Sequence, residues 1–438
     1  MNFDLMRSLL IDRALRGELF SNVTSVEAEG KSLEEEQTIP FTIPNHWQWK
    51  RVADCVQFNP KVIQDDAVEV SFIPMADVEP GFVDQCSTRQ AKPWAKVKKG
   101  FSRFQEGDLL VAKITPCFQN RKSCVAKSLI NGTGAGSTEF HVMRCVSGVD
   151  AKFLLYFFKS EYFIRYGVNH FNGTVGQQRV GAQDIKDCLI PVPSVEEQVR
   201  IVAKLEEAFA EIDRAEKAYE ELQTLAGVLR GQILQEAIQG KLVPHLAEEG
   251  VVEQIGAASE EVPFEIPESW RWVTLASVGK THTGATPSTS KKEYFGSDIP
   301  FVKPGDIDHC LLTYREDGLS TAAYEVARLV PEKTLLMVCI GGSIGKVALC
   351  DREVSFNQQI NAIVCNEELA LPEYLFVIMR SPYFQDEVWR NATGTATPII
   401  NKSRWGKIWI PLPSTKEQVR IVAKVEDLMK QVDALSTR

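Results

Sequence analysis

A few short stretches come close to known catalytic or cofactor-binding motifs. "IGGSIGKV" (Ile340–Val347) resembles a phosphate loop, but Ile340 replaces the required first glycine and Val347 the required Ser or Thr. The six histidines form no HExxH pattern, and "DHC" (Asp308–Cys310) is better explained as part of a loop than as a metal site. "SPYF" at Ser381 lacks the second proline of the tetrapeptide with which amino-methyltransferases hold a flipped base. We therefore expect no catalytic chemistry from this chain.

Five polar loops carry Arg, Lys, Asn and Gln, the side chains that grip phosphates or contact base edges. They are Lys113–Lys122, Asn172–Val180, Thr281–Lys292, Ser355–Asn361 and Asn391–Arg404. Taken one at a time, ordinary solvated loops remain an equal alternative. Together with the basic stretch described next and with Lys346 of the stretch Ile340–Val347, they supply the candidate DNA-binding residues: Arg89, Lys92, Lys96, Lys98, Lys99, Arg103, Lys113, Asn120, Arg121, Lys122, Thr174, Gln177, Gln178, Arg179, Thr283, Thr286, Ser288, Lys291, Lys292, Lys346, Asn357, Gln358, Gln359, Thr395, Thr397, Asn401, Lys402 and Arg404.

The charge is unevenly distributed along the 438 residues. The formal net charge is −9, but two acidic stretches, 21–40 and 245–263, account for all of it. From Gln85 to Lys127, ten basic residues face only two acidic ones. A local basic field can attract a polyanion although the whole chain is acidic. Because the second half lacks such a cluster, we expect the first half to depend more on phosphate contacts and to bind in a more salt-sensitive way.

The elements that must position these loops are repeated. "IPVPSVEEQVRIVAKLEEAF" from Ile190 returns as "IPLPSTKEQVRIVAKVEDLM" from Ile410, with 13 of 20 positions identical. "FTIPNHWQWKRV" at Phe41 likewise matches "FEIPESWRWVTL" at Phe264. The period of ~220 residues is far longer than the ~20–50 of solenoid repeats, which indicates a duplicated domain. One helical repeat is central and the other is split between the two ends, so the arrangement is circular.

The sequence predicts long helices and mixed α/β domains. Ser194 with Glu197, and Ser414 with Glu417, are capping boxes that predict helix starts. Apolar positions with helical spacing run through the central repeat at Leu205, Phe209, Ile212, Tyr219, Leu222, Leu225, Leu229 and Ile233. Gly227 and Gly231 predict a break or a close helix crossing there. In the mixed segments we expect strands at 108–114 and 334–340, helices at 152–163 and 372–384, and the W-x-W tryptophans as core residues.

The predicted fold is α/β: two pseudo-symmetric α/β domains, which in the family named below would be target-recognition domains, separated by an antiparallel, coiled-coil-like pair of long helices in a circularly arranged repeat. The expected boundaries are 1–22 for an N-terminal helix, 23–193 for domain 1, 194–262 for a central helical spacer, 263–413 for domain 2 and 414–438 for a C-terminal helix. The ten cysteines contain no CxxC pair and no apolar run reaches the length of a membrane span. We expect reduced thiols, no signal peptide, no membrane partner and a cytoplasmic location.

Taken together, these motifs resemble the specificity subunits of type I restriction–modification enzymes. The resemblance covers the whole chain and rests on the two I-P-x-P-S-x-x-E-Q-x-x-I-V signatures (Ile190–Val202 and Ile410–Val422), the W-x-W motif and "QGKLVP" (Gln239–Pro244). It implies a non-catalytic subunit that binds an asymmetric, bipartite double-stranded DNA site, with the helices fixing the gap. It also implies two methyltransferase subunits, and restriction or translocase subunits, as partners. S-adenosylmethionine, ATP and Mg²⁺ are expected in those partners, and no cofactor in this chain.

An alternative from another class is a bivalent, non-catalytic adaptor that binds protein or RNA through its duplicated domains. The acidic total charge supports this reading and the basic stretch opposes it. A fused enzyme would require motifs that the sequence lacks.

Overall fold

The two repeated motifs of each half pair with each other as antiparallel strands. The computed structural model describes residues 1–20, 39–86, 90–174, 176–256, 263–394 and 396–436. In the first half, β1 (Gln48–Arg51) contains the second tryptophan of the W-x-W motif and pairs with β12 (Leu189–Val192), with Trp49 opposite Pro191. In the second half, β13 (Arg271–Thr274) pairs with β25 (Trp409–Leu412), with Trp272 opposite Pro411. Trp47, Trp270 and Trp272 are buried, so these tryptophans serve the core as expected.

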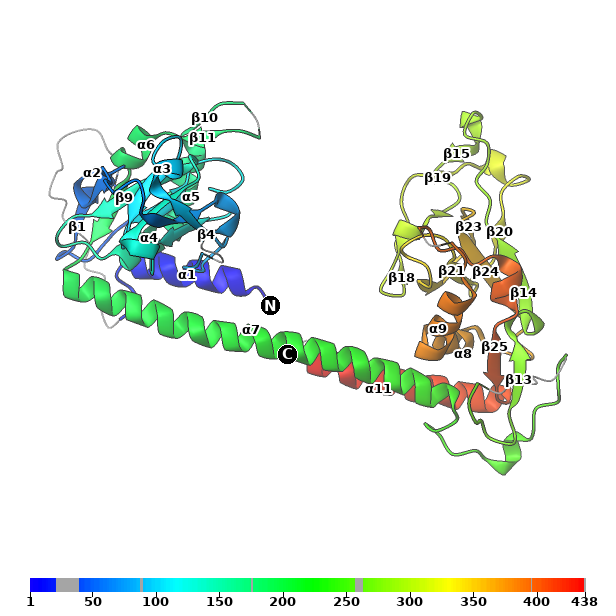
Figure 1. Ribbon diagram of the computed structural model, residues 1–438. Coiled ribbons are helices and arrows are strands. Elements are labelled where there is room, and N and C mark those ends of the chain that lie inside the picture. The colour runs from blue at the N-terminus through cyan, green and yellow to red at the C-terminus, as the bar shows by residue number, and fades with distance from the viewer. Residues whose placement is uncertain (21–38, 87–89, 175, 257–262, 395, 437–438) are drawn as a thin grey trace. The chain divides into compact units, whose positions relative to one another are not determined.

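The chain divides into two compact units, Met1–Tyr219 and Glu220–Arg438, which confirms the duplication (Figure 1). The boundary falls inside the 44-residue helix α7 (Val195–Ile238). The helix thus begins where the predicted spacer begins but ends well before residue 262, and α1 (Phe3–Leu15) ends before residue 22. The C-terminal helix α11 spans Thr415–Ser436.

Unit 1 contains two four-stranded sheets, in the orders β2-β9-β6-β7 and β4-β3-β8-β5. Its other helices and strands are α2 (Val52–Cys55), β2 (Val56–Phe58), β3 (Glu69–Ile73), β4 (Gln90–Pro93), α3 (Trp94–Val97), β5 (Ser102–Gln105), β6 (Leu109–Ala112), β7 (Ser123–Val125), β8 (Thr133–Gly136), β9 (Phe140–Cys145), α4 (Ala151–Lys159), α5 (Glu161–Asn169), β10 (Phe171–Asn172), β11 (Arg179–Val180) and α6 (Ala182–Asp187).

Unit 2 repeats the first of these sheets as β14-β24-β21-β22, whereas its other strands form a three-stranded sheet β16-β23-β20 and two-stranded pairs. Its elements are β14 (Gly279–Thr283), β15 (Phe295–Gly296), β16 (Phe301–Val302), β17 (Ile307–Asp308), β18 (Leu311–Leu312), β19 (Gly318–Leu319), β20 (Leu329–Val330), β21 (Leu335–Val338), β22 (Val347–Leu349), β23 (Val354–Phe356), β24 (Ile360–Cys365), α8 (Pro372–Arg380), α9 (Pro382–Asn391) and α10 (Lys402–Gly406).

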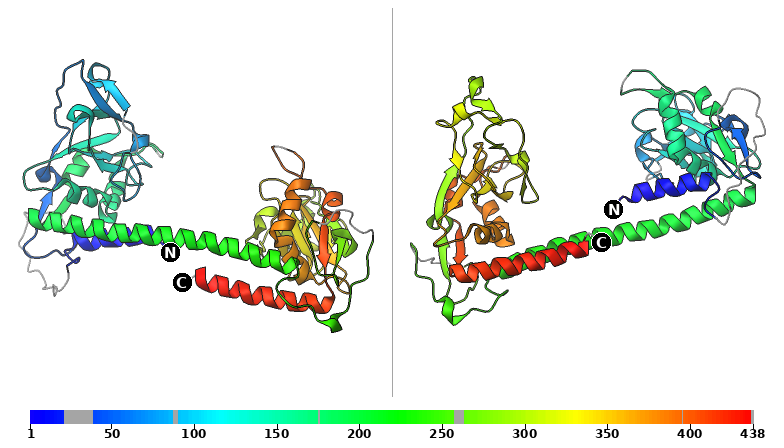
Figure 2. Two further views of the ribbon diagram at one scale, coloured as in Figure 1. Left: turned by 60° about the horizontal axis from the view of Figure 1, so that its bottom comes forward. Right: turned by 180° about the vertical axis from the view of Figure 1, so that it is seen from behind.

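The long helices share the hydrophobic cores of their units. In unit 1, α1 lies alongside the first part of α7, and Phe3 contacts Tyr219 with ring centroids 6.0 Å apart (Figure 2). In unit 2, α11 lies alongside the second part of α7, where Arg230 donates to Asp433 at 2.7 Å. Both pairs are antiparallel: α1 runs from the middle of α7 toward its start, and α11 runs from the end of α7 toward its middle (Figure 2).

Two expectations about helix continuity were wrong in detail. The helices expected at 152–163 and 372–384 each divide in two, because Ser160 and Ser381 end one helix and cap the next by accepting the N–H of Phe163 and Phe384. The glycines of α7 cause no break, and they mark no close crossing among the described residues: a Cβ on Gly231 would meet Pro382 at an ordinary contact distance of 3.5 Å, and a Cβ on Gly227 would meet nothing within 4 Å. The expected apolar face is interrupted as well, since Leu222, Leu225 and Leu229 are exposed.

Candidate nucleic-acid interface

In unit 1, four segments meet where strands of the sheet β2-β9-β6-β7 end. They are the end of β2, the end of β6, the turn before β9, and β11. The end of β6 hydrogen-bonds both to the turn before β9 and to β11: Lys113 N–H donates to Glu139 O (2.9 Å), and Val180 N–H donates to Lys113 O (3.0 Å). Asn59, which follows β2, donates its N–H to Val142 O at 2.7 Å. We call this group of segments the unit 1 loop cluster. It unites two of the predicted loops, those that contain Lys113 and Arg179.

An ion pair dominates the unit 1 loop cluster. The Nε and Nη2 atoms of Arg179 each donate to a different oxygen of Glu139 at 2.9 Å, and Nη1 donates to Gln177 O at 3.0 Å. The hydrogen bond from Arg179 lowers the pKa of Glu139, and the same bond raises the pKa of Arg179. Both groups are therefore charged at neutral pH, and the pair is neutral as a whole.

A cavity of about 530 Å³ opens beside this pair. Arg103, Lys113 and Arg179, all predicted DNA-binding residues, line it together with Phe101 and His141. His141 is buried, and desolvation lowers its pKa to about 4, so the ring is neutral at pH 7. Its Nε2 then carries the proton that is donated to Val180 O at 3.0 Å. The cationic character of the cavity thus comes from the Arg and Lys side chains.

Unit 2 assembles the corresponding four segments at the matching strand ends of the sheet β14-β24-β21-β22. Gly284 N–H donates to Ile360 O (3.0 Å), Cys339 N–H donates to Gln359 O (2.7 Å), and Ile400 N–H donates to Cys339 O (3.0 Å). A Cβ on Gly284 would lie 2.1 Å from Asn357 O, so only glycine permits this approach. This unit 2 loop cluster unites the three loops predicted in the second half of the sequence.

Three hydrogen bonds between side chains of the unit 2 loop cluster join amides and hydroxyls. Thr286 Oγ1 donates to Gln358 Oε1 at 2.7 Å, and Thr283 Oγ1 donates to Asn361 Oδ1 at 2.8 Å. Asn357 Nδ2 donates to Gln359 Oε1 at 3.0 Å. The same place in the two units therefore presents different chemistry: a charged pair in unit 1 and oriented neutral amides in unit 2.

Five of the ten residues of the predicted basic stretch lie between β4 and β5 of unit 1: Lys92 on β4, Lys96 on α3, Lys98 and Lys99 in the turn after α3, and Arg103 on β5. Lys96, Lys99 and Arg103 are exposed and make no ion pair with any described residue. By contrast, Lys98 pairs with Asp66 at 2.6 Å, and Lys92 lies over the ring of Phe72, 3.3 Å from its centroid. The field is therefore weaker than the count of ten basic residues predicted, but three cations remain available for phosphates.

Several predicted residues are held by structural partners. Arg121 pairs with Glu161 at 2.6 Å, Lys122 donates to Met75 O, Lys346 pairs with Asp308, and Asn401 caps α10 by accepting the N–H of Arg404. Lys291 donates to the hydroxyl of Tyr294. The predicted residues that are exposed on loops, turns or the ends of short helices are Asn120, Thr174, Gln177, Thr286, Ser288, Lys291, Lys292, Gln358, Thr397, Asn401, Lys402 and Arg404. Arg89 and Thr395 lie outside the described residues.

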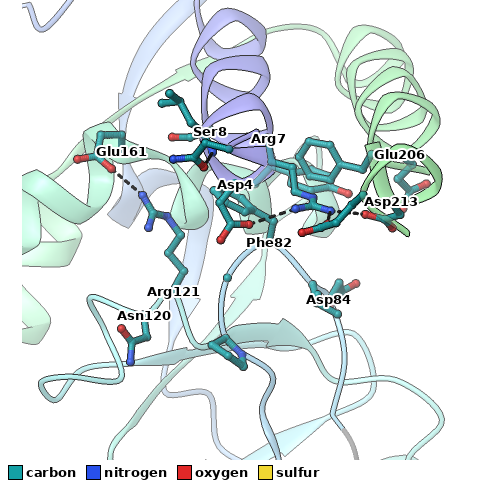
Figure 3. Close-up of a pocket in the computed structure, with 18 of the residues that line it drawn as sticks. Asp4, Arg7, Ser8, Phe82, Asp84, Asn120, Arg121, Glu161, Glu206 and Asp213 are labelled. Atoms are coloured by element: carbon teal, nitrogen blue, oxygen red, sulfur yellow. Dashed lines mark hydrogen bonds and ion pairs between the residues drawn. The ribbon is translucent and has the colours of Figure 1, made fainter. Parts of the chain in front are cut away.

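A larger cavity of about 1140 Å³ in unit 1 has the opposite character (Figure 3). Six carboxylates and two guanidinium groups line it, and Asn120 and Arg121 lie on its rim. Arg7 alone holds three of the carboxylates, those of Asp4, Asp213 and Glu216. A cavity lined by so many carboxylates repels a phosphate backbone. Asn120 and Arg121, which line it, are therefore weaker candidates for DNA contacts than Lys113 is.

One group of side chains in unit 2 has the composition of a metal site. His245, Glu249 and Glu417 bring their ligand atoms within 4.8 Å of one another. However, Arg420 already donates to both oxygens of Glu249 at 2.7 Å, and His245 Nδ1 lies 3.3 Å from Glu417 Oε2. The group is an ion-pair network that links α11 to the segment after α7.

Glu139 and His141 are part of the unit 1 loop cluster although the sequence did not single them out. Neither belongs to the basic and amide residues by which the sequence marks its candidate loops. The turn "STEF" just before the strand at 140–145 was the available signal, since polar residues at a strand end commonly form sites.

The sequence matches the family described as "Type I restriction modification DNA specificity domain" twice, over residues 44–224 and 267–438. Among curated proteins, the EcoAI specificity subunit of Escherichia coli is 27% identical, over 98% of this chain and 89% of its own. The HindI specificity subunit of Haemophilus influenzae is 34% identical, but over only 36% of this chain and 35% of its own.

Two solved structures share the fold at 20% identity. A chain from a study titled "Structural basis underlying complex assembly and conformational transition of the type I R-M system" superposes with a TM-score of 0.73 over 91% of this chain and 94% of its own. The HsdS subunit from Thermoanaerobacter tengcongensis gives a TM-score of 0.59 over 90% and 92%.

Proposed function

Since this chain belongs to the family of type I restriction–modification DNA specificity domains, we propose that it recognises a bipartite, asymmetric DNA site through its two loop clusters. One observation carries the proposal. The same four-segment arrangement recurs in both units, while the side chains that it presents differ. A duplicated scaffold that presents different side chains in its two copies suits two different half-sites, because each base edge is distinguished by its pattern of hydrogen-bond donors and acceptors.

The basic surface on β4, α3 and β5 would grip the DNA backbone beside the unit 1 loop cluster. Phosphate contacts position a protein on DNA, whereas base contacts specify the sequence. Lys96, Lys99 and Arg103 supply the first kind of contact, and the loop clusters supply the second. Unit 2 has no equivalent run of basic residues in its sequence, so its half-site would depend more on hydrogen bonds to bases.

The long helices are our candidate for docking two methyltransferase subunits and, through them, restriction or translocase subunits. Large apolar side chains are exposed on all three: Leu5 and Leu9 on α1, Val199 and Leu225 on α7, and Val419 on α11. Exposed apolar residues grouped on helices favour association with another protein. We further propose that a single continuous α7 sets the gap between the half-sites.

In this proposal the chain itself is not catalytic. S-adenosylmethionine would be bound by the methyltransferase subunits, and ATP and Mg²⁺ by the restriction subunits. No helix in the described part of the chain is both long and apolar enough to cross a membrane. We propose a cytoplasmic location, where the DNA and the partner subunits would be found.

A direct binding comparison separates this function from that of an adaptor for RNA or protein. The full chain, assembled with the methyltransferase subunit encoded beside it, is titrated with duplex DNA from its host and with duplex RNA of the same sequence. Preferential binding of DNA, with sequence dependence among DNA fragments, is the expected result. Equal or tighter binding of RNA would favour the adaptor.

A further inference from the structure

The guanidinium of Arg179 has two N–H donors that no described residue accepts. An arginine side chain offers five N–H donors. Glu139 takes two of them, from Nε and Nη2, and the backbone oxygen of Gln177 takes one from Nη1. One N–H on each terminal nitrogen is left over. The side chain is 43% exposed, so this remaining pair can reach a molecule bound at the cavity.

We propose that Arg179 reads a guanine base in one half-site, and that Glu139 is the positioning residue that holds its guanidinium in place. The inference rests on the proposed function, because it assigns a base to one side chain of the unit 1 loop cluster. Two N–H donors on the neighbouring terminal nitrogens of one guanidinium match the O6 and N7 acceptors that guanine presents in the major groove. No other base offers two adjacent acceptors there.

Charge argues for a base and against a phosphate at this position. Glu139 places a full negative charge 2.9 Å from the guanidinium, so the pair as a whole is neutral. A phosphate would gain little from the charge of Arg179, because Glu139 already balances it, whereas a base edge needs only the free N–H groups. The carboxylate can in addition accept a hydrogen bond from N4 of a cytosine, which is the partner of guanine. Nearby Lys113, which has no carboxylate partner among the described residues, is the better candidate for a phosphate.

The pair is specific to unit 1. In the unit 2 loop cluster, Gln359 takes the place of Glu139, because its backbone oxygen accepts the N–H of Cys339 as that of Glu139 accepts the N–H of Lys113. Ile399 takes the place of Arg179, because it forms a β-bridge with Ile340 as Arg179 does with Ile114. Neither of these residues can form an Arg–Glu pair. The guanine assigned to Arg179 should therefore occur in one half-site only, at a single position.

The variants R179K and E139Q test the assignment without removing a side chain from the fold. Lysine keeps the positive charge but loses the planar fork, and glutamine keeps the shape of Glu139 but loses its charge. K99Q, at an exposed lysine of the basic surface, serves as the comparison for a phosphate contact. Each full chain is assembled with its methyltransferase subunit and titrated with duplexes in which every base pair of the half-sites is replaced in turn.

For the unmodified complex we expect one G·C pair whose replacement weakens binding by roughly 5- to 140-fold. In R179K that preference should disappear at this pair alone, while preferences elsewhere stay unchanged; E139Q should reduce it. K99Q should weaken all duplexes alike. The inference is overturned if R179K keeps every preference, or if it weakens all duplexes equally. It is also overturned if E139Q tightens binding to every sequence, as removing a negative charge beside a phosphate would do.

These outcomes are separable from failure of the proposed function. If the unmodified complex shows no sequence preference at any position, the proposed function itself fails. If it prefers a bipartite site but R179K does not alter that site, only the assignment of Arg179 fails.

Discussion

Gln198 and Gln418, 220 residues apart, make the same three hydrogen bonds in their own units. Each side-chain oxygen accepts a backbone N–H, from Asp150 at 2.7 Å and from Leu371 at 2.8 Å respectively. Each side-chain nitrogen donates to two backbone oxygens between 2.9 and 3.1 Å away. The glutamine of the repeated E-Q motif therefore fastens the start of each long helix to the segment that leads into α4 or α8.

We expect Q198A and Q418A each to lower the free energy of unfolding by about 2–4 kcal/mol, because three backbone groups lose their partner in a buried place. Denaturant unfolding of the purified chain measures the change. The exposed Gln431 on α11 provides the comparison, and Q431A should stay within about 0.5 kcal/mol of the unmodified protein. Equal effects of all three substitutions would contradict the structural role.

A second duplicated contact joins the end of each helical repeat to the W-x-W segment. Gly17 and Gly240 have φ of +76° and +70°, and a Cβ at either would lie 2.4–2.5 Å from Pro44 or Pro267. We expect G17A and G240A to cost about 1–2 kcal/mol from backbone strain and about 1–3 kcal/mol more from overpacking.

G107A isolates the backbone part of that cost. Gly107 has a φ of +84° and open space around its Cβ position. Its substitution should cost only about 1–2 kcal/mol. Thermal or denaturant unfolding of the three variants gives the comparison, and a G107A effect as large as that of G17A would argue against the contact with Pro44.

The buried His141 predicts acid sensitivity. Its folded-state pKa of about 4 lies below the unfolded value of 6.5, so the unfolded chain binds more protons between these values. The contribution of His141 to stability is complete above pH 6.5 and is lost as the pH falls toward 4, by up to about 3 kcal/mol. In H141Q the unfolding free energy should fall less over this range. H46Q, at an exposed histidine, should leave the steep dependence intact, and an unchanged profile in H141Q would contradict the account.

The exposed cations on β4, α3 and β5 predict a salt effect. The triple variant K96A/K99A/R103A should weaken DNA binding to all sequences alike and make the salt dependence shallower by up to about three phosphate contacts. Binding isotherms over a range of salt concentrations give the slope. Lys333, Lys416 and Lys430 are also exposed, and their triple alanine variant should keep the original slope. A change of recognised motif in the first variant would assign these residues to base reading.

Much of the architecture follows from local sequence signals. The capping serines at Ser194 and Ser414 each accept an N–H three residues on, and the helices begin at the next residue. The repeat predicted a duplicated domain, because a motif that occurs twice is expected to find the same partner twice. In each unit the strand after the first W-x-W tryptophan pairs with the I-P-x-P strand, β1 with β12 and β13 with β25. The sequence identified the three polar loops of unit 2 as candidates, but their convergence at one end of a sheet is known only from the fold.

The Arg179–Glu139 pair could not be predicted, because its members are 40 residues apart and belong to segments joined only by the folded sheet. The division of the predicted helices at Ser160 and Ser381 was missed for a different reason. A serine inside an apolar helical pattern can either stay in the helix or cap a new one, and tertiary packing decides between these outcomes. The partners of Lys98 and Arg121 likewise come from distant segments, so counting basic residues overstated the free charge.

The central claim is that two unlike loop clusters read two unlike half-sites, and mapping of methylated bases tests it most directly. The chain is co-expressed with its methyltransferase subunit in a host without DNA methylation, and N6-methyladenine is located across the genome. The account predicts a bipartite motif with two different halves and a fixed gap, present only when this chain is present. A soluble, assembled complex that leaves the genome unmethylated, or methylates it without a bipartite motif, would contradict it.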